Sequence, residues 1–267
     1  MAEEFFDAEQ FERFSKGVLH LWDIDLNSYG QRQLHRRLRF MMERAGDADL
    51  DAFLQHLTED RELSAKLKDQ FTINVSEFFR DAHLFARLET MLRPGGQCHG
   101  ARRVWSAGCS YGAEPYSLAM LLTEYTGGSD WQVIATDIDH GALKQAREGL
   151  FSERDVRNVT AARRRKYFTR TDDGKYAISP QLQARVKFGK LDLLKPKGRP
   201  PTNCDLVLCR NVIIYFTTEA KQQVHKLLAS ALRPGGVLLI GATERVPNAL
   251  DLGLKSISPF FYERQAA

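Results

Sequence analysis

Apolar residues recur at helical spacing through the first part of the chain, from about residue 5 to residue 70. They follow one another at intervals of three or four in the stretches 11–21, 34–42 and 50–57, and none of these stretches alternates as a strand would. The pattern predicts a small all-α domain at the N-terminus.

A different pattern begins after residue 100. The breaker-rich segment 93–100 ends an expected helix at 84–92, and short apolar runs then predict strands at 104–107, 131–136, 205–209 and 237–241. Amphipathic runs between them predict helices at 115–125, 141–148 and 218–232, the last stopping at Pro234-Gly235-Gly236. Strands that alternate with helices favour an α/β fold with a mostly parallel sheet covered on both faces.

Two short alternating runs flank Asp173-Gly174 and predict a hairpin, because Asp-Gly suits a tight turn. We therefore expect a small β insertion at about 165–188. The segment Ser258–Arg264 has the composition of a strand and is expected at an edge of the sheet. The chain is thus divided into a helical domain with its linker, residues 1–80, and a second domain, residues 81–267.

Composition, with 43% hydrophobic and 27% charged residues, is that of an ordinary globular protein and excludes a disordered or fibrous one. The acidic start of the chain is unlike a signal peptide, and no apolar run approaches the roughly 18 residues of a membrane span. We expect a cytoplasmic protein that does not insert into a membrane. Four cysteines without a Cys-x-x-Cys pair favour reduced core thiols over disulfides or a metal site. A net charge of +4 is weak evidence for nucleic acid as a partner.

The loop Ala107–Pro115 follows the first predicted strand and contains Gly108 and Gly112, which let the backbone approach a ligand. It lacks the Gly-x-Gly-x-x-Gly phosphate fingerprint, and Glu114 at the start of the next helix would repel a pyrophosphate. An adenosine cofactor bearing an amine and a sulfonium therefore fits better than a nicotinamide dinucleotide. A plain strand-to-helix turn is the alternative.

Polar residues also follow two later strands. Asp137 stands where dinucleotide folds bind ribose hydroxyls, whereas Asp139 is expected to cap the next helix. Arg210, Asn211 and Tyr215 come just after the strand at 205–209. Such a cluster favours a functional site; the alternative is that Asn211 caps a turn and Tyr215 packs.

Four segments resemble, in the same order, motifs of the CheR-type chemotaxis receptor glutamate methyltransferases. They are Phe71–Arg80 (FTINVSEFFR), Trp105–Ser117 (WSAGCSYGAEPYS), Ala135–Asp139 (ATDID) and Cys209–Phe216 (CRNVIIYF). The resemblance extends over nearly the whole chain. It implies a Rossmann-like S-adenosylmethionine-dependent methyltransferase domain with a small inserted antiparallel β subdomain, preceded by a small all-α domain.

By position in these motifs, the resemblance implies roles for individual residues. The cofactor pocket would be formed by Asn74, Ser76, Arg80, Gly108, Glu114, Asp137, Asp192, Leu193, Arg210 and Asn211. Glu114 would meet the methionine part, Asp137 the ribose and Asp192 the adenine. Arg80 and Tyr215 would be the catalytic residues beside the transferring methyl group, and no metal is expected. The family's loop commonly reads Ser-Thr-Gly-Glu-Glu-Pro, where this chain has Ser110-Tyr-Gly-Ala-Glu-Pro115, and the Asp192 position is often Asn.

The implied reaction transfers the methyl group of S-adenosylmethionine to glutamate side chains of chemotaxis receptors. It would give glutamate 5-O-methyl esters for sensory adaptation, with S-adenosylhomocysteine as the other product. The basic helix Gln31–Arg44 is expected to dock on the receptor's acidic methylation helices, a solvated helix face being the alternative. A C-terminal receptor tether peptide is not expected to bind the short hairpin; the basic run Arg163–Lys166 beside it could serve instead or be solvated.

Two rival functions stay open. One is a methyltransferase of the same fold acting on nucleic acid or a small molecule, although Arg210–Tyr215 lacks the prolines of the Asp/Asn-Pro-Pro-aromatic motif of amino-directed DNA methylation. The other is a non-catalytic adenosyl-binding regulator, against which only Arg80 and Tyr215 argue. A nicotinamide oxidoreductase is disfavoured by the missing phosphate fingerprint.

Overall fold

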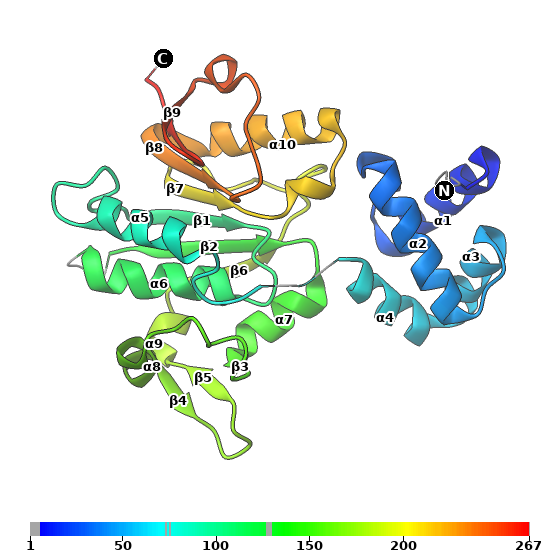
Figure 1. Cartoon of the computed structure of the whole chain (residues 1–267), viewed down its shortest axis with the longest axis horizontal. Coiled ribbons are helices and arrows are strands. Elements are labelled where there is room, and N and C mark those ends of the chain that lie inside the picture. The colour runs from blue at the N-terminus through cyan, green and yellow to red at the C-terminus, as the bar shows by residue number, and fades with distance from the viewer. Residues whose placement is uncertain (1–5, 73, 75, 127–129, 267) are drawn as a thin grey trace. The chain divides into compact units, whose positions relative to one another are not determined.

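The computed structural model describes residues 6–72, 74, 76–126 and 130–266. The chain forms two compact units (Figure 1). One takes residues 1–73 and 215–221, and the other takes residues 74–214 and 222–267. A short segment from late in the chain therefore belongs to the N-terminal helical unit.

The helical unit contains α1 (Ala8–Trp22), the 3-10 helix η1 (Leu26–Ser28), α2 (Gln31–Ala45), α3 (Leu50–Glu59) and α4 (Arg61–Phe71). Aspartate carboxylates cap three of the four α-helices by accepting backbone N–H groups of the first turn. The capping residues are Asp7, Asp49 and Asp60.

Aromatic contacts and backbone hydrogen bonds hold the helical unit together. The rings of Phe14 in α1 and Phe53 in α3 stack with 5.6 Å between their centroids. The late segment joins the unit through a bridge between Tyr29 and Phe216, whose rings meet edge to face. The loop before α2 is therefore fixed by residues almost two hundred positions away in sequence.

The second unit is built on a seven-stranded sheet with the order β6-β2-β1-β7-β8-β10-β9. The strands are β1 (Arg103–Ala107), β2 (Gln132–Asp137), β6 (Val186–Lys190), β7 (Cys204–Cys209), β8 (Leu232–Ile240), β9 (Leu254–Ser258) and β10 (Phe261–Arg264). The first five are parallel to one another, while β10 runs antiparallel between β8 and β9. The predicted α/β fold with a mostly parallel sheet is confirmed.

Helices before and between the parallel strands cover both faces of the sheet. They are α5 (Ala82–Leu92), α6 (Ala113–Tyr125), α7 (His140–Glu148) and α10 (Thr218–Ala231). From β1 the chain adds β2 and then β6 on one side, and from β7 it adds β8 on the other side. Because crossovers between parallel strands are right-handed, the two directions place α6 and α7 on one face of the sheet and α10 on the opposite face (Figure 1). The strand order reverses between β1 and β7, and ligands bind at such a switch point in open α/β sheets.

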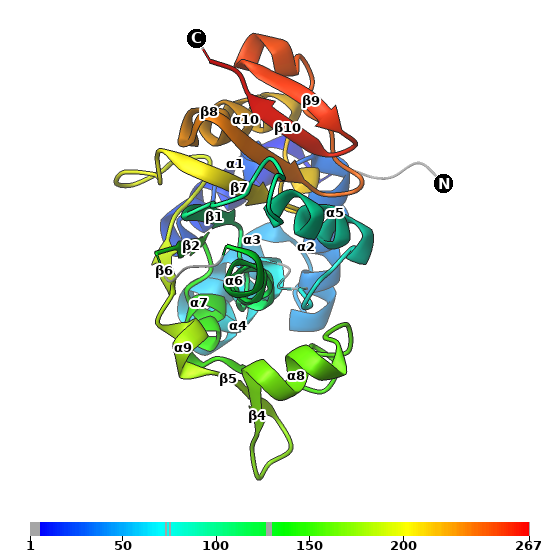
Figure 2. The same cartoon turned by 90° about the vertical axis from the view of Figure 1, so that its left-hand side faces the viewer.

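A smaller three-stranded antiparallel sheet is inserted between β2 and β6. It consists of β3 (Leu150–Phe151), β5 (Tyr176–Ile178) and β4 (Phe168–Arg170) in that order, with α8 (Ala161–Tyr167) and α9 (Pro180–Gln183) beside it. Figure 2 shows β4 and its turn extending away from the main sheet. We call residues 150–183 the β subdomain. A small inserted antiparallel sheet was predicted, but at about 165–188: the subdomain begins earlier, with β3, and residues 186–188 belong to β6 of the main sheet.

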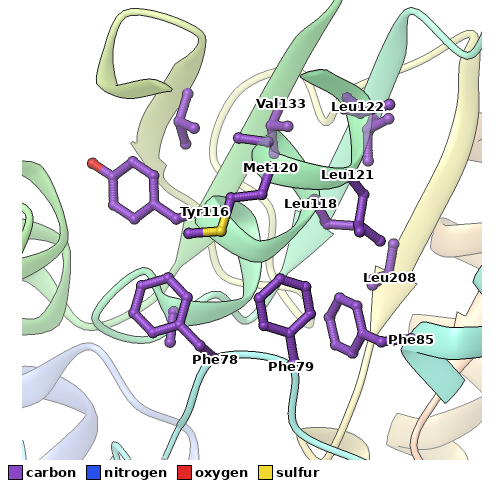
Figure 3. Packing of buried hydrophobic residues seen from close by; sticks show 14 of the residues in the cluster. Phe78, Phe79, Phe85, Tyr116, Leu118, Met120, Leu121, Leu122, Val133 and Leu208 are labelled. Atoms are coloured by element: carbon purple, nitrogen blue, oxygen red, sulfur yellow. The ribbon is translucent and has the colours of Figure 1, made fainter. Parts of the chain in front are cut away.

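A continuous apolar core runs from the main sheet into the β subdomain. Phe78, Phe79 and Phe85 point towards the buried face of α6, where Met120 lies between them and the sheet (Figure 3). The Phe78 ring also meets Phe151 of β3 at 4.7 Å between centroids. The segment before α5 is therefore packed against both α6 and the β subdomain.

Two details of the predicted elements are wrong. The strand at the C-terminus is not at an edge, because β9 pairs with its outer side, and Pro234-Gly235-Gly236 lies within β8 rather than ahead of it. The register of β8 against β7 shifts between Cys204 and Leu206, which accommodates the segment with the proline. The edge strands β6 and β9 were not predicted, since exposed residues such as Lys187 and Lys255 interrupt their apolar patterns.

All four cysteines are buried free thiols, as predicted. Burial raises the pKa of Cys98 to about 12, so this thiol stays protonated at neutral pH. Within the described residues, no helix has both the length and the apolar character to cross a membrane.

Candidate cofactor site

The loop after β1 folds back over the sheet because its backbone adopts left-handed conformations. Gly108, Ser110 and Gly112 have φ values of 78°, 49° and 96°. A Cβ on Gly108 would lie 2.4 Å from Cγ2 of Val212, in the turn after β7. Glycine is thus required at position 108 both for its backbone conformation and for the packing of the two turns at the switch point.

Asp137 ends β2 with its carboxylate directed into this loop. One oxygen accepts the Ser110 N–H at 2.7 Å and the other accepts the Asp139 N–H at 2.9 Å. Burial raises the pKa of Asp137, and these two backbone hydrogen bonds oppose the rise. Each oxygen keeps a further lone pair, which can accept a hydroxyl of a ribose.

Asp139 caps α7, as expected, by accepting the Ala142 N–H at 3.0 Å. Its second oxygen accepts a hydrogen bond from the Asn74 side-chain amide at 2.5 Å. Asn74 Oδ1 in turn accepts the Ser110 hydroxyl at 3.2 Å. The motif segment before α5 is therefore joined to the ends of β1 and β2; Ile73 and Val75 of that motif lie outside the described residues.

The rest of this segment makes a sharp turn on α6. Phe79 and Asp81 have φ values of 53° and 56°, and the Phe79 N–H donates to the Ser117 hydroxyl at 3.1 Å. Arg80 lies between these two left-handed residues. Residues other than glycine rarely adopt this backbone conformation, and such residues cluster at functional sites.

Arg210 follows β7 and has an almost fully buried side chain, 2% exposed. Its Nη2 donates to the Arg80 carbonyl and to the Asp81 carboxylate, both at 2.7 Å. Its Nη1 lies 3.2 Å from Oε2 of Glu114, and the guanidinium stacks over Phe85. Arg210 thus joins the end of β7 to the Arg80 turn and to the start of α6.

Glu114, at the start of α6, is held on both oxygens. Oε1 accepts the Ser106 hydroxyl at 2.7 Å and Oε2 faces Arg210. The carboxylate is fixed in place and can still accept a hydrogen bond from an ammonium group.

The turn after β7 depends on a buried glutamate that the sequence did not single out. Glu244, in the loop after β8, accepts the Gly241 N–H at 2.7 Å and the Asn211 N–H at 3.1 Å. Burial raises the pKa of Glu244. The sequence could have indicated Glu244 by its position, because it lies just past the carboxyl end of the core strand β8. Asn211 itself has φ 59°, and its Oδ1 is buried without a hydrogen-bond partner among the described residues.

Asp192 and Leu193 follow β6, next to β2. The Leu191 N–H donates to the Asp137 carbonyl at 3.0 Å, which brings this loop to the end of β2. The Asp192 carboxylate accepts the Leu194 N–H at 2.8 Å, while Leu193 is buried.

Tyr215 belongs to the helical unit and Arg80 to the α/β unit. Tyr215 ends the 3-10 helix η2 (Ile213–Tyr215), and its carbonyl accepts the Gly30 N–H at 2.8 Å. The backbone of Tyr215 is therefore fixed to the loop before α2.

The groups at the switch point suit an S-adenosyl cofactor. Carboxylates at Asp137 and Glu114 match ribose hydroxyls and an ammonium, and the orphaned Asn211 oxygen can accept one further hydrogen bond. Carboxylates would repel the pyrophosphate of a dinucleotide.

Comparison with known proteins agrees with this geometry. The family model "CheR methyltransferase, all-alpha domain" matches residues 9–72, and "CheR methyltransferase, SAM binding domain" matches residues 74–258. The chain belongs to the CheR methyltransferase family. The predicted membership is confirmed, and with it the S-adenosylmethionine cofactor and the methyltransferase class.

Curated relatives cover nearly all of this CheR chain. The "Chemotaxis protein methyltransferase" of Listeria monocytogenes is 36% identical over 93% of this chain and 95% of its own length. "Chemotaxis protein methyltransferase 1" of Pseudomonas aeruginosa is 32% identical over 90% of this chain and 92% of its own. The corresponding Escherichia coli protein is 32% identical over 88% and 83%.

Proposed function

We propose that this CheR methyltransferase esterifies glutamate side chains of chemotaxis receptors. The observation that carries the proposal is the match, over about nine-tenths of the chain, to curated proteins named chemotaxis protein methyltransferases. Receptor glutamates would become 5-O-methyl esters, which remove negative charge from the receptor's methylation helices.

When bound, S-adenosylmethionine supplies a methyl group on a positively charged sulfur. In the proposed reaction a glutamate oxygen forms the new bond to the methyl carbon as the sulfur–methyl bond breaks, and S-adenosylhomocysteine leaves. A glutamate with a pKa of about 4.3 is already ionised at neutral pH, so the chain needs no general base. Its task is to position and desolvate the carboxylate.

Arg80 is the proposed carboxylate-orienting group, because a guanidinium presents two parallel N–H donors to a carboxylate. Its backbone is fixed from both sides by the left-handed turn and by Arg210. Tyr215 would donate a second hydrogen bond. These contacts orient the nucleophile, and excessive stabilisation of its charge would slow attack.

The proposed cofactor ligands surround the switch point. Asp137 would accept the ribose hydroxyls and Glu114 the methionine ammonium, while Asp192 and Leu193 would adjoin the adenine. The remaining ligands in the proposal are Asn74, Ser76, Gly108, Arg210 and Asn211, with Arg210 acting chiefly by holding Glu114 and the Arg80 backbone.

An exposed stripe on helix α2 supports a role in docking the receptor. Its residues are four positions apart, so each lies about one helical turn from the next. Arg32, Arg36, Phe40 and Arg44 form this α2 stripe. Phe40 is 55% exposed, and the Arg44 guanidinium lies 5.6 Å from its ring centroid. Acidic receptor helices would meet both charge and an apolar contact there.

Arg37 does not belong to the α2 stripe. It is half-buried over the Phe71 ring, 5.1 Å from the centroid, and donates to the Gln70 carbonyl. Burial lowers the pKa of Arg37. Arg37 therefore holds α2 to α4, and a docking test should leave it unchanged.

The tether peptide is left out of the proposal. Strands β4 and β5 have three residues each, so their hairpin offers a short edge. Receptors with and without their C-terminal tail should be methylated at similar rates.

Mass spectrometry of receptor fragments tests the acceptor. Incubation with enzyme and S-adenosylmethionine should add the mass of one methylene to peptides at glutamate, and replacing those glutamates by alanine should abolish the addition. Modification of lysine, of nucleic acid or of a small molecule instead would reject the proposal, and so would cofactor binding with no transfer to any of them.

A further inference from the structure

Tyr111 is the loop residue at which this chain departs from the Ser-Thr-Gly pattern of the family. Its phenol oxygen accepts the Ser76 N–H at 3.2 Å and also contacts the Ser76 carbonyl. The same oxygen lies 3.3 Å from Oδ1 of Asp155. A threonine hydroxyl is several bonds closer to the backbone and could not occupy this position.

Asp155 belongs to the β subdomain and is held by its own turn. Its Oδ2 accepts the N–H and the hydroxyl of Ser152, at 2.8 and 2.7 Å. Its carbonyl accepts the Phe78 N–H at 3.3 Å. The ion pair of Arg157 with Glu77 also joins the β subdomain to the segment before α5.

The phenol of Tyr111 is protonated at neutral pH, and burial raises its pKa further, to about 12. A phenol has only one proton, which can go to the Ser76 carbonyl or to the Asp155 carboxylate. Asp155 and Ser76 are therefore connected through one oxygen atom.

We propose that Tyr111 is a positioning residue that fastens Ser76 and the following Arg80 turn to the β subdomain through Asp155, and thereby sets cofactor affinity. The proposal rests on the proposed place of Ser76 in the cofactor pocket. Ser110, the preceding residue, donates its hydroxyl to the Asn74 side-chain oxygen. Two consecutive loop residues thus fix both ends of the Asn74–Ser76 stretch.

The first test is Tyr111→Phe, which removes one hydroxyl and keeps the ring. Loss of one hydrogen bond should weaken S-adenosylhomocysteine binding about 5-fold by calorimetry. In the cofactor-free protein, the Ser76 amide should exchange with deuterium faster, because its acceptor has gone. Tyr111→Thr should show the same weaker S-adenosylhomocysteine binding and the same faster Ser76 exchange, because its hydroxyl cannot reach Ser76.

Tyr176→Phe is the matched control. It deletes a tyrosine hydroxyl of the β subdomain, which donates to Glu153 at 2.6 Å and makes no hydrogen bond to the described residues between Asn74 and Arg80. It should leave cofactor affinity and Ser76 exchange unchanged. An equal weakening by both variants would mean general loosening of the β subdomain and would overturn the proposal.

A double-mutant cycle tests the route through Asp155. Asp155→Ala should weaken S-adenosylhomocysteine binding less in the Tyr111→Phe background than in the wild-type background, because damage to the Ser152 turn is common to both backgrounds and cancels in the coupling energy. Additive losses would overturn the proposed transmission. Unchanged affinity in Tyr111→Phe would overturn the positioning role even if Ser76 exchange increased. Failure of the proposed function would be distinct, because wild-type protein would then bind S-adenosylhomocysteine and methylate no receptor.

Discussion

The Arg210 guanidinium donates a hydrogen bond to the backbone carbonyl of Arg80 over 2.7 Å. The two residues are 130 positions apart, and the bond ties the end of β7 to the turn that carries the proposed catalytic arginine. The same guanidinium also pairs with Asp81 and Glu114, so a single buried charge joins the groups around the proposed methyl-transfer site.

Arg210→Lys tests this arrangement, because lysine keeps the charge and loses the planar fork. We expect kcat to fall about 10-fold or more, and the free energy of unfolding in urea to fall by about 1–3 kcal/mol as Asp81 and Glu114 lose donors. Arg233→Lys is the control: Arg233 pairs with Asp205 at 2.6 Å, at the other end of β7. Equal effects of the two substitutions on kcat would contradict a positioning role for Arg210.

Arg80→Met should separate catalysis from cofactor binding. We expect kcat to fall about 100-fold, a loss typical of removing one oriented electrostatic contact, while S-adenosylhomocysteine affinity changes by less than about 3-fold. Steady-state methylation and calorimetry measure the two quantities. Normal turnover in the variant would remove Arg80 from the active site.

The α2 stripe should govern receptor recognition and leave the cofactor site untouched. Arg36→Glu and Phe40→Ala should each lower kcat/KM for the receptor about 10-fold at low salt, and added salt should shrink the effect of the arginine change only. Lys66→Glu, an exposed charge reversal on α4, is the matched control. If all three variants methylate the receptor like wild type, another surface docks the receptor.

His35 predicts a pH-dependent stability of the helical unit. Its ring is buried between Phe6 and Phe11, Nδ1 accepts the Phe6 N–H at 3.0 Å, and burial followed by the nearby Arg39 charge lowers its pKa. The unfolded chain therefore binds a proton more readily, so the free energy of unfolding should fall as pH drops through about 6.5, by at most about 1.4 kcal/mol per pH unit.

Urea unfolding between pH 7.5 and pH 5.5 measures this slope. His35→Asn keeps an acceptor for the Phe6 N–H and should flatten the slope, whereas His20→Asn on the exposed face of α1 should not. Equal slopes in the wild type and both variants would assign the pH dependence to other groups.

The sequence predicted the centre of the fold well because β1, β2, β7 and β8 are buried on both faces and read as continuous apolar runs. Edge strands were missed because half of their residues face solvent. The run Arg163–Lys166 was interpreted as a docking or solvated surface. Arg163 is instead 15% exposed and paired with Glu89 and Glu124, which raise its pKa although burial opposes them.

Within the candidate site, the sequence could place polar groups at the carboxyl ends of core strands, as with Asp137 at the end of β2 and Asn211 in the turn after β7. The contacts that hold these residues in place could not be predicted, because they join backbone groups to side chains far away in sequence. Glu244 meets the Asn211 N–H from 33 positions away, and Tyr111 meets Ser76 from 35. No local pattern shows which of these groups the fold will bring together.

The most direct test of the proposed function is transfer of radiolabelled methyl from S-adenosylmethionine to receptor-enriched membranes, followed by mild alkali. Carboxyl methyl esters hydrolyse under these conditions, so the label should be released as volatile methanol, and Arg80→Met enzyme should leave little label to release. Label that resists alkali, or no label despite measurable cofactor binding, would contradict a glutamate carboxylate as the acceptor.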